Sequence, residues 1–154
     1  MYSRLGRKGR SAVLRSAVRQ KLERADREML GGIDLGDIGQ VYDVMNRRWW
    51  DGELKLKVLE LGDCGKGADG LYTPIDKAIL IDEELDELDR VGVLLHEMCH
   101  LSVDLRYDYL SIGEKTGRIP WHGKRWKEEM GRVGFGGVVN SYSGEDRFSW
   151  YRSS

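Results

Sequence analysis

The sequence predicts an α+β fold, in which a small antiparallel or mixed sheet packs on one long, buried helix. Two observations carry this prediction. From Asp89 to Leu105, apolar residues recur every three or four positions, which is typical of a helix. Between residues 54 and 81, short apolar segments are separated by turn residues, which is typical of strands.

The composition indicates one globular domain. The chain has 154 residues, of which 40% are hydrophobic and 33% are charged, and this balance excludes a disordered or fibrous protein. No segment approaches the roughly 18 uninterrupted apolar residues of a membrane span. Cys64 and Cys99 are too few for a disulfide framework, and the first residues lack the apolar core of a secretory signal. We therefore expect an intracellular protein, cytoplasmic or nuclear, without a membrane partner.

Four helices are expected. The first covers residues 11–30, and the second runs from Asp37, as its N-cap, to Trp49 or Trp50. The third is the long buried helix, and the fourth covers about residues 123–133. The residues expected to face inward from the first two helices are Leu14, Val18, Leu22, Ala25, Met29, Ile38, Val41, Met45 and Trp49.

Three strands are expected between the second and third helices. Residues 54–58 alternate apolar and polar side chains, as a half-buried strand does. A glycine-rich loop at 62–70 follows, and segments 71–74 and 78–81 then flank a turn. Pro74 places its strand at an edge of the sheet or ends it there, because proline cannot donate to a ladder.

Three regions are expected in the chain: a basic arm (1–32), a core (33–135) and a tail rich in aromatic residues (136–154). Residues 1–30 carry nine Lys or Arg and three Asp or Glu, whereas the other 124 residues carry sixteen and twenty-three. A basic arm on an acidic body suggests a polyanionic partner for the arm.

The long helix carries the sequence His96-Glu97-Met98-Cys99-His100, which is the pattern H-E-x-x-H. Residues four apart lie on one face of a helix, one turn apart, so His96 and His100 can share one tetrahedral zinc ion. Glu97 projects beside that face, where it can act as a general base toward water. The sequence therefore predicts a zinc site of catalytic type.

Catalytic zinc needs a third protein ligand, and His122 is the one other histidine of the chain. It follows Pro120-Trp121 at the start of the fourth predicted helix. Asp104 lies one turn past His100, and there we expect it to accept a hydrogen bond from the N–H of a ligand histidine. The alternative oxygen ligands are Asp104, Asp108, Glu114 and Glu128.

Together, His96-Glu97-Met98-Cys99-His100 and His122-Gly123-Lys124-Arg125-Trp126 resemble the SprT-like metallopeptidases, a family that includes the Spartan-type DNA-dependent proteases. The segment Asn46–Leu54 also resembles the family's aromatic helix end and its turn into the first strand. The resemblance covers about residues 40–135. It implies a zincin-like fold, zinc on the three histidines and Glu97 as the general base. It also implies an edge strand, between Tyr72 and Ile81, that aligns an extended protein substrate by backbone pairing.

The sequence departs from the family pattern in two respects. The interval between His100 and His122 is long, so residues 108–119 form an insertion that can act as a lid or a specificity element. The cysteine-rich zinc ribbon of many relatives is missing. The expected function is hydrolysis of peptide bonds in protein, including protein bound or crosslinked to DNA. The alternatives are a peptidase without a nucleic-acid role and a nucleic-acid-associated protein with a structural zinc ion.

Candidate nucleic-acid contacts lie near both termini. Arg4, Arg7, Lys8 and Arg10 can bind the phosphates of single-stranded DNA or of DNA crosslinked to protein. A solvated amphipathic helix and an organelle presequence are the competing interpretations of the arm. Trp150 and Tyr151, with Arg147 and Arg152, either stack on single-stranded nucleic acid or dock on the body of the protein. The other tryptophans and Cys99 are expected to line the core or a pocket.

Overall fold

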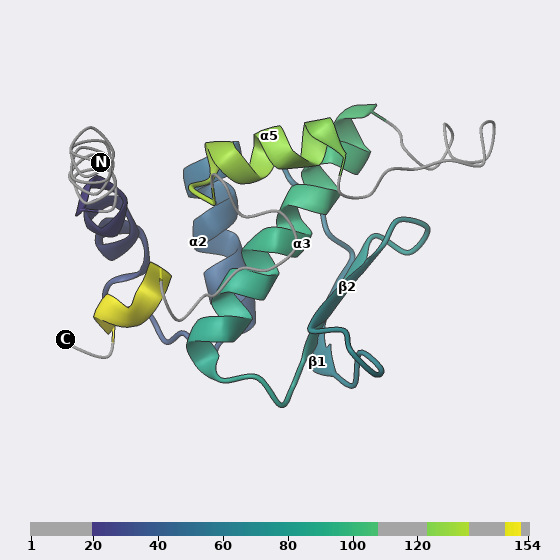
Figure 1. Ribbon diagram of the computed structural model, residues 1–154, viewed down its shortest axis with the longest axis horizontal. Coiled ribbons are helices and arrows are strands. Elements are labelled where there is room, and N and C mark those ends of the chain that lie inside the picture. Colours follow the sequence, from purple (N-terminus) through teal and green to yellow (C-terminus); the bar gives the residue numbers. More distant parts are fainter. Residues whose placement is uncertain (1–19, 108–122, 136–146, 152–154) are drawn as a thin grey trace, which may run out of the picture.

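The computed structural model describes residues 20–107, 123–135 and 147–151, and it has an α+β fold. The central element is helix α3 (Glu87–Tyr107). Helices α2 (Ile38–Trp50) and α5 (Lys124–Arg132) pack against α3, and so do strands β2 (Gly70–Thr73) and β3 (Ala78–Asp82) (Figure 1). Residues 20–30 are also helical, and a short 3-10 helix, η1 (Ser149–Tyr151), lies near the C-terminus.

The sheet of the described residues is mixed, as expected. Its order is β1-β3-β2, in which β1 (Val58–Gly62) runs parallel to β3 and β2 runs antiparallel to it. Ile79 and Ile81 of β3 point toward α3 and are buried. Strand β2 ends at Thr73, immediately before Pro74, as the proline predicts.

The first strand begins later than the sequence predicts. Residues 54–57 lie outside β1, and at Leu54 both backbone polar groups bind the side chain of Asn46. Asn46 Nδ2 donates to the Leu54 carbonyl at 3.0 Å, and the Leu54 N–H donates to Asn46 Oδ1 at 3.1 Å. The apolar alternation of this segment therefore reflects packing of Leu54 into the core rather than pairing in a ladder.

Helix α2 begins as predicted, and both tryptophans at its end pack on the core. The side chain of Asp37 accepts a hydrogen bond from the N–H of Gln40, as an N-cap does. Trp49 is half-buried and packs against the core, as expected, but Trp50 is more deeply buried. The reason is that the Trp50 indole finds polar partners on α3 and α5, which periodicity within α2 does not reveal.

Helix α3 is buried along most of its length. It begins at Glu87, two residues before the expected start, within an acidic segment that the positive end of the helix dipole favours. Every residue from Val91 to Asp104 is buried. A helix that is covered on one side by a sheet and on others by helices has no solvent-facing stripe, which explains the burial of its polar residues as well.

The described C-terminal residues pack on the first helical segment. Arg147 pairs with buried Asp26, with Nε–Oδ2 and Nη2–Oδ1 distances of 2.9 and 3.1 Å. Phe148 and Trp150 are buried, and the Tyr151 hydroxyl donates to the carbonyl of Ile33 at 3.2 Å. Of the alternatives for the tail, docking on the body is therefore confirmed for residues 147–151. Within the described ranges, no helix combines the length and the apolar character that a membrane span requires.

Candidate metal centre

His96 and His100 lie together on one face of α3. Their ring centroids are 5.0 Å apart with an angle of 63° between the ring planes, and both side chains are buried. The helical spacing alone brings the two imidazoles within reach of one small cation, as the sequence predicts. Nitrogen donors in an apolar setting suit zinc.

Trp126 of α5 closes one side of this histidine pair. Its ring centroid lies 4.9 Å from that of His96 and 5.2 Å from that of His100, and its plane is within 15° of the His100 ring. Trp126 stands in the first turn of α5, whose N-cap is Gly123. The start of α5 is therefore at the histidine pair, and one peptide bond joins Gly123 to His122.

Glu97 is buried beneath strand β2. Its Oε1 atom lies 3.9 Å from His96 Nε2, and burial raises the pKa of its carboxyl to about 8. A Cβ atom on Gly70 would stand 2.5 Å from Val93 Cγ1 and 3.3 Å from Glu97 Oε1. Glycine at position 70 thus allows the backbone of β2 to lie directly against Glu97 and Val93.

Asp104 joins α3 to the β2–β3 hairpin. Its Oδ2 atom accepts a hydrogen bond from the Tyr72 hydroxyl at 2.5 Å and lies 2.6 Å from Lys77 Nζ. Burial, together with the Asp104 carboxylate, raises the pKa of Tyr72. We call Tyr72, Lys77 and Asp104 the hairpin latch. Tyr72 and Lys77 lie 32 and 27 residues from Asp104, so no local sequence pattern indicates these partners.

Several predicted site residues lie outside the described residues. These are His122, the alternative ligands Asp108 and Glu114, the insertion 108–119, and the arm residues Arg4, Arg7, Lys8 and Arg10. Within the described residues, no group of three or more His, Cys, Asp or Glu side chains is arranged to hold a metal ion. His96 and His100 provide two donors there, so a zinc site of catalytic type needs His122 or another donor from beyond these ranges.

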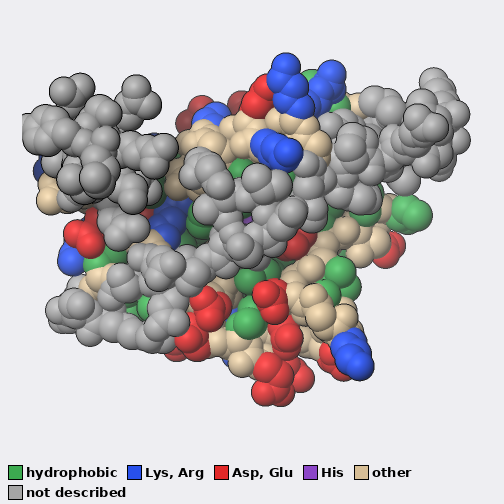
Figure 2. Space-filling model, in the orientation of Figure 1, with side chains coloured by type: hydrophobic (Ala, Val, Ile, Leu, Met, Phe, Trp, Pro, Cys, Tyr) green, Lys and Arg blue, Asp and Glu red, His purple; other side chains and the backbone are tan. Residues whose placement is uncertain are grey.

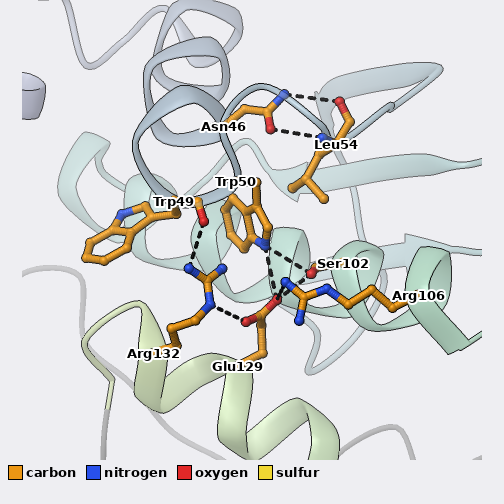
Figure 3. A network of polar contacts seen from close by, with 8 residues as sticks. All are labelled: Asn46, Trp49, Trp50, Leu54, Ser102, Arg106, Glu129 and Arg132. Atoms are coloured by element: carbon orange, nitrogen blue, oxygen red, sulfur yellow. Dashed lines mark hydrogen bonds and ion pairs between the residues drawn. The ribbon is translucent and has the colours of Figure 1, made fainter.

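A second polar cluster, which the sequence does not reveal, ties α5 to the other two helices (Figure 3). Glu129 of α5 accepts hydrogen bonds from Trp50 Nε1 at 3.0 Å and from the Ser102 hydroxyl. Arg132 Nε lies 2.6 Å from its Oε1 atom, and Arg106 Nη2 lies 3.2 Å from Oε2. Burial raises the pKa of Glu129, but the hydrogen bonds from Arg132, Ser102 and Trp50 outweigh burial, so the pKa is lowered overall.

The described surface separates charges of opposite sign (Figure 2). Lys and Arg side chains gather over α5, where Lys124, Arg125 and Lys127 are exposed. Asp and Glu side chains gather around the start of α3, where Glu83, Glu84, Asp86 and Glu87 are exposed. The guanidinium of Arg147 is held by Asp26 and Trp150 is buried, so neither is arranged to stack on a nucleic acid base.

Both cysteines are buried and free. Cys99 lies in the core, as predicted, and burial is the largest of the causes that raise its pKa. Cys64 packs its sulfur against backbone carbonyls of Asp69 and Leu80. Neither thiol is placed to act as a nucleophile.

Comparisons with protein-family models, with curated proteins and with solved structures gave no match to this chain.

Proposed function

We propose that this protein is a zinc-dependent metalloendopeptidase of SprT-like type, with a zincin-like arrangement of α3 and the sheet. His96, His100 and His122 would hold the metal ion, and Glu97 would act as the general base. The observation that carries the proposal is the contact of Trp126 with both imidazole rings. It brings the start of α5 to the histidine pair. We propose His122 as the third ligand because one peptide bond joins it to Gly123 at that helix start.

The proposed chemistry is hydrolysis of a peptide bond. A zinc ion held by the three histidines would supply a Lewis acid that makes water more acidic. Burial raises the pKa of Glu97 to about 8, so the carboxylate form that acts as the base becomes more populated as the pH rises toward that value. That carboxylate would take the proton of the attacking water and pass it to the amine nitrogen as the peptide C–N bond breaks. Burial of the carboxyl excludes bulk water from this transfer, since Glu97 is covered by the backbone of β2.

Strand β2 is suited to hold an extended substrate. In the described sheet it pairs with β3 on one side, so its other side is an edge at which a peptide can pair. Because Gly70 brings the β2 backbone against Glu97, a peptide paired with this edge would pass close to the general base. The hairpin latch would hold the same strand in place on α3.

The substrate class we propose is protein, including protein bound or crosslinked to DNA. The basic arm supports the DNA-associated part, since residues 1–30 carry nine basic and three acidic side chains. The exposed Lys124, Arg125 and Lys127 of α5 add positive charge next to the histidine pair.

The test is proteolysis of an unfolded protein by zinc-loaded wild type and Glu97→Gln, each with and without single-stranded DNA. Glu97→Gln should keep the zinc and lose cleavage. If wild type cleaves only when DNA is present, the result supports a DNA-dependent protease. Equal cleavage without DNA keeps the peptidase and removes the nucleic-acid role. Bound zinc without cleavage in any condition overturns the peptidase and favours a structural zinc ion.

A further inference from the structure

The most highly connected buried charge in the described residues is Glu129, which is not part of the predicted metal centre. Its side chain is 3% exposed, whereas that of its neighbour Glu128 is 63% exposed. Donors on three helices converge on its two carboxylate oxygens: Trp50 from α2, Ser102 and Arg106 from α3, and Arg132 from α5 itself (Figure 3).

The donors around Glu129 compensate its buried negative charge, and their directional hydrogen bonds can fix the orientation of α5. A buried carboxylate is strongly unfavourable unless it is paired and hydrogen-bonded. Glu129 has a guanidinium at each oxygen and two neutral donors at Oε2. Arg132 also donates from Nη1 to the Trp49 carbonyl at 2.7 Å, which ties the end of α2 into the same cluster. Hydrogen bonds have a preferred geometry, so they fix the position of α5 relative to α2 and α3 more closely than apolar packing alone does.

The position of the cluster relates it to the histidine pair. Ser102 follows His100 by two residues on α3, and Glu129 follows Trp126 by three residues on α5. Residues three apart on a helix share a face, so Trp126 and Glu129 both point at α3. The contact between Glu129 and Ser102 lies within one turn of α5 from the contact between Trp126 and His100. It therefore fixes how α5 is rotated about its axis and shifted along α3 at that point.

We propose that Glu129 is a positioning residue of the metal centre. Through α5, it holds the indole of Trp126 against the imidazoles of His96 and His100. This inference rests on the proposed zinc site. It adds to that site a residue that touches neither the metal ion nor its ligands.

The test compares metal binding by full-length Glu129→Gln with wild type and with Glu28→Gln as the control, since Glu28 is an exposed glutamate of the helical segment 20–30. Co²⁺ is the probe, because its visible spectrum reports the number and arrangement of ligands, and Zn²⁺ competition gives the affinity. Measurements are made at a temperature where each variant has the far-ultraviolet circular dichroism of wild type. We expect Glu129→Gln to bind about tenfold more weakly, with an altered Co²⁺ spectrum, and Glu28→Gln to match wild type.

A second variant keeps the inference testable if Glu129→Gln does not fold. Arg132 lies at the exposed side of the cluster, and Arg132→Gln removes the contacts with Glu129 and with the Trp49 carbonyl. It should weaken Co²⁺ binding in the same direction by a smaller factor. Variants that melt at lower temperature but bind Co²⁺ with wild-type affinity and spectrum overturn the positioning role, and the proposed zinc site stands. If wild type itself binds neither Co²⁺ nor Zn²⁺, the proposed function fails as well.

Discussion

The indole of Trp126 and the imidazole of His100 lie nearly parallel, with ring centroids 5.2 Å apart and 15° between their planes. One ring comes from α5 and the other from α3, so this stack is a tertiary contact between two helices. It joins the two halves of the proposed site. Stability and metal binding should therefore respond together to changes at this contact.

Trp126→Ala should lower the free energy of unfolding by about 3–5 kcal/mol, because Trp126 is fully buried and its removal leaves a cavity. Urea unfolding followed by circular dichroism measures the effect. Trp49→Ala is the control, since Trp49 is half-buried, and a smaller loss is expected there. Equal losses in the two variants would contradict the central place of Trp126 in the core.

Gly70→Ala should push β2 away from α3. The added Cβ would stand 2.5 Å from Val93 Cγ1, and such overpacking costs about 1–3 kcal/mol. Cleavage should fall further than stability, since the same strand is proposed to hold the substrate over Glu97. Gly131→Ala is the matched control, because its Cβ meets nothing within 4 Å and alanine stabilises a helix by about 0.5–1 kcal/mol. Wild-type cleavage by Gly70→Ala would remove β2 from the substrate site.

Lys77→Met should destabilise the protein by about 3 kcal/mol, the lower end of the range for breaking a buried ion pair. The Asp104 side chain is 1% exposed and would keep the Tyr72 hydroxyl as its partner, while Lys77 is 26% exposed. Combining Lys77→Met with Asp104→Asn should cost less than the two changes summed. Lys66→Met, in an exposed loop, should change stability by less than about 0.5 kcal/mol. Strict additivity in urea unfolding would show that the pair of Lys77 and Asp104 contributes no interaction energy.

The lowered pKa of Glu129 predicts a specific dependence of stability on pH. Its value in the folded protein lies below the ordinary 4.5, so the unfolded chain binds more protons than the folded one between the two values. The contribution of Glu129 is present above pH 4.5 and is lost as the pH falls through the folded pKa. Wild type should therefore lose more stability than Glu129→Gln between about pH 5 and pH 3.

Urea unfolding at a series of pH values measures this difference. The control is Glu128→Gln. The Glu128 side chain is mostly exposed, so this substitution should leave the pH dependence of stability as it is in wild type. Parallel curves for wild type and Glu129→Gln would mean that the carboxylate is not stabilised by its arginine and hydroxyl partners.

The sequence predicts the fold class and the long helix well because both follow from local periodicity. The pattern from Val91 to Leu105 and the spacing of His96 and His100 are properties of one helix, and they need no knowledge of its neighbours. The N-cap at Asp37 and the strand end before Pro74 are also local, since each depends on the chemistry of one residue.

The features that the sequence does not predict all depend on contacts between distant segments. The choice between Trp49 and Trp50 as the buried residue depends on Glu129, which lies 79 residues from Trp50. The strand expected at residues 54–58 begins at Val58, and both backbone polar groups of Leu54 bind the side chain of Asn46. The Oδ2 atom of Asp104 binds Tyr72 and Lys77 of the hairpin, which the spacing of Asp104 from His100 does not reveal. Periodicity contains no information about such partners.

The most direct test of the proposed metal centre is the zinc content and zinc affinity of wild type beside His122→Gln and Glu97→Gln. Wild type and Glu97→Gln should each bind about one zinc ion per chain, because Glu97 is not a ligand. His122→Gln should bind zinc at least about tenfold more weakly, since one of three protein ligands is lost. Zinc affinity unchanged in His122→Gln, or no zinc bound by wild type, would contradict a metal centre built by α3 and the residue before α5.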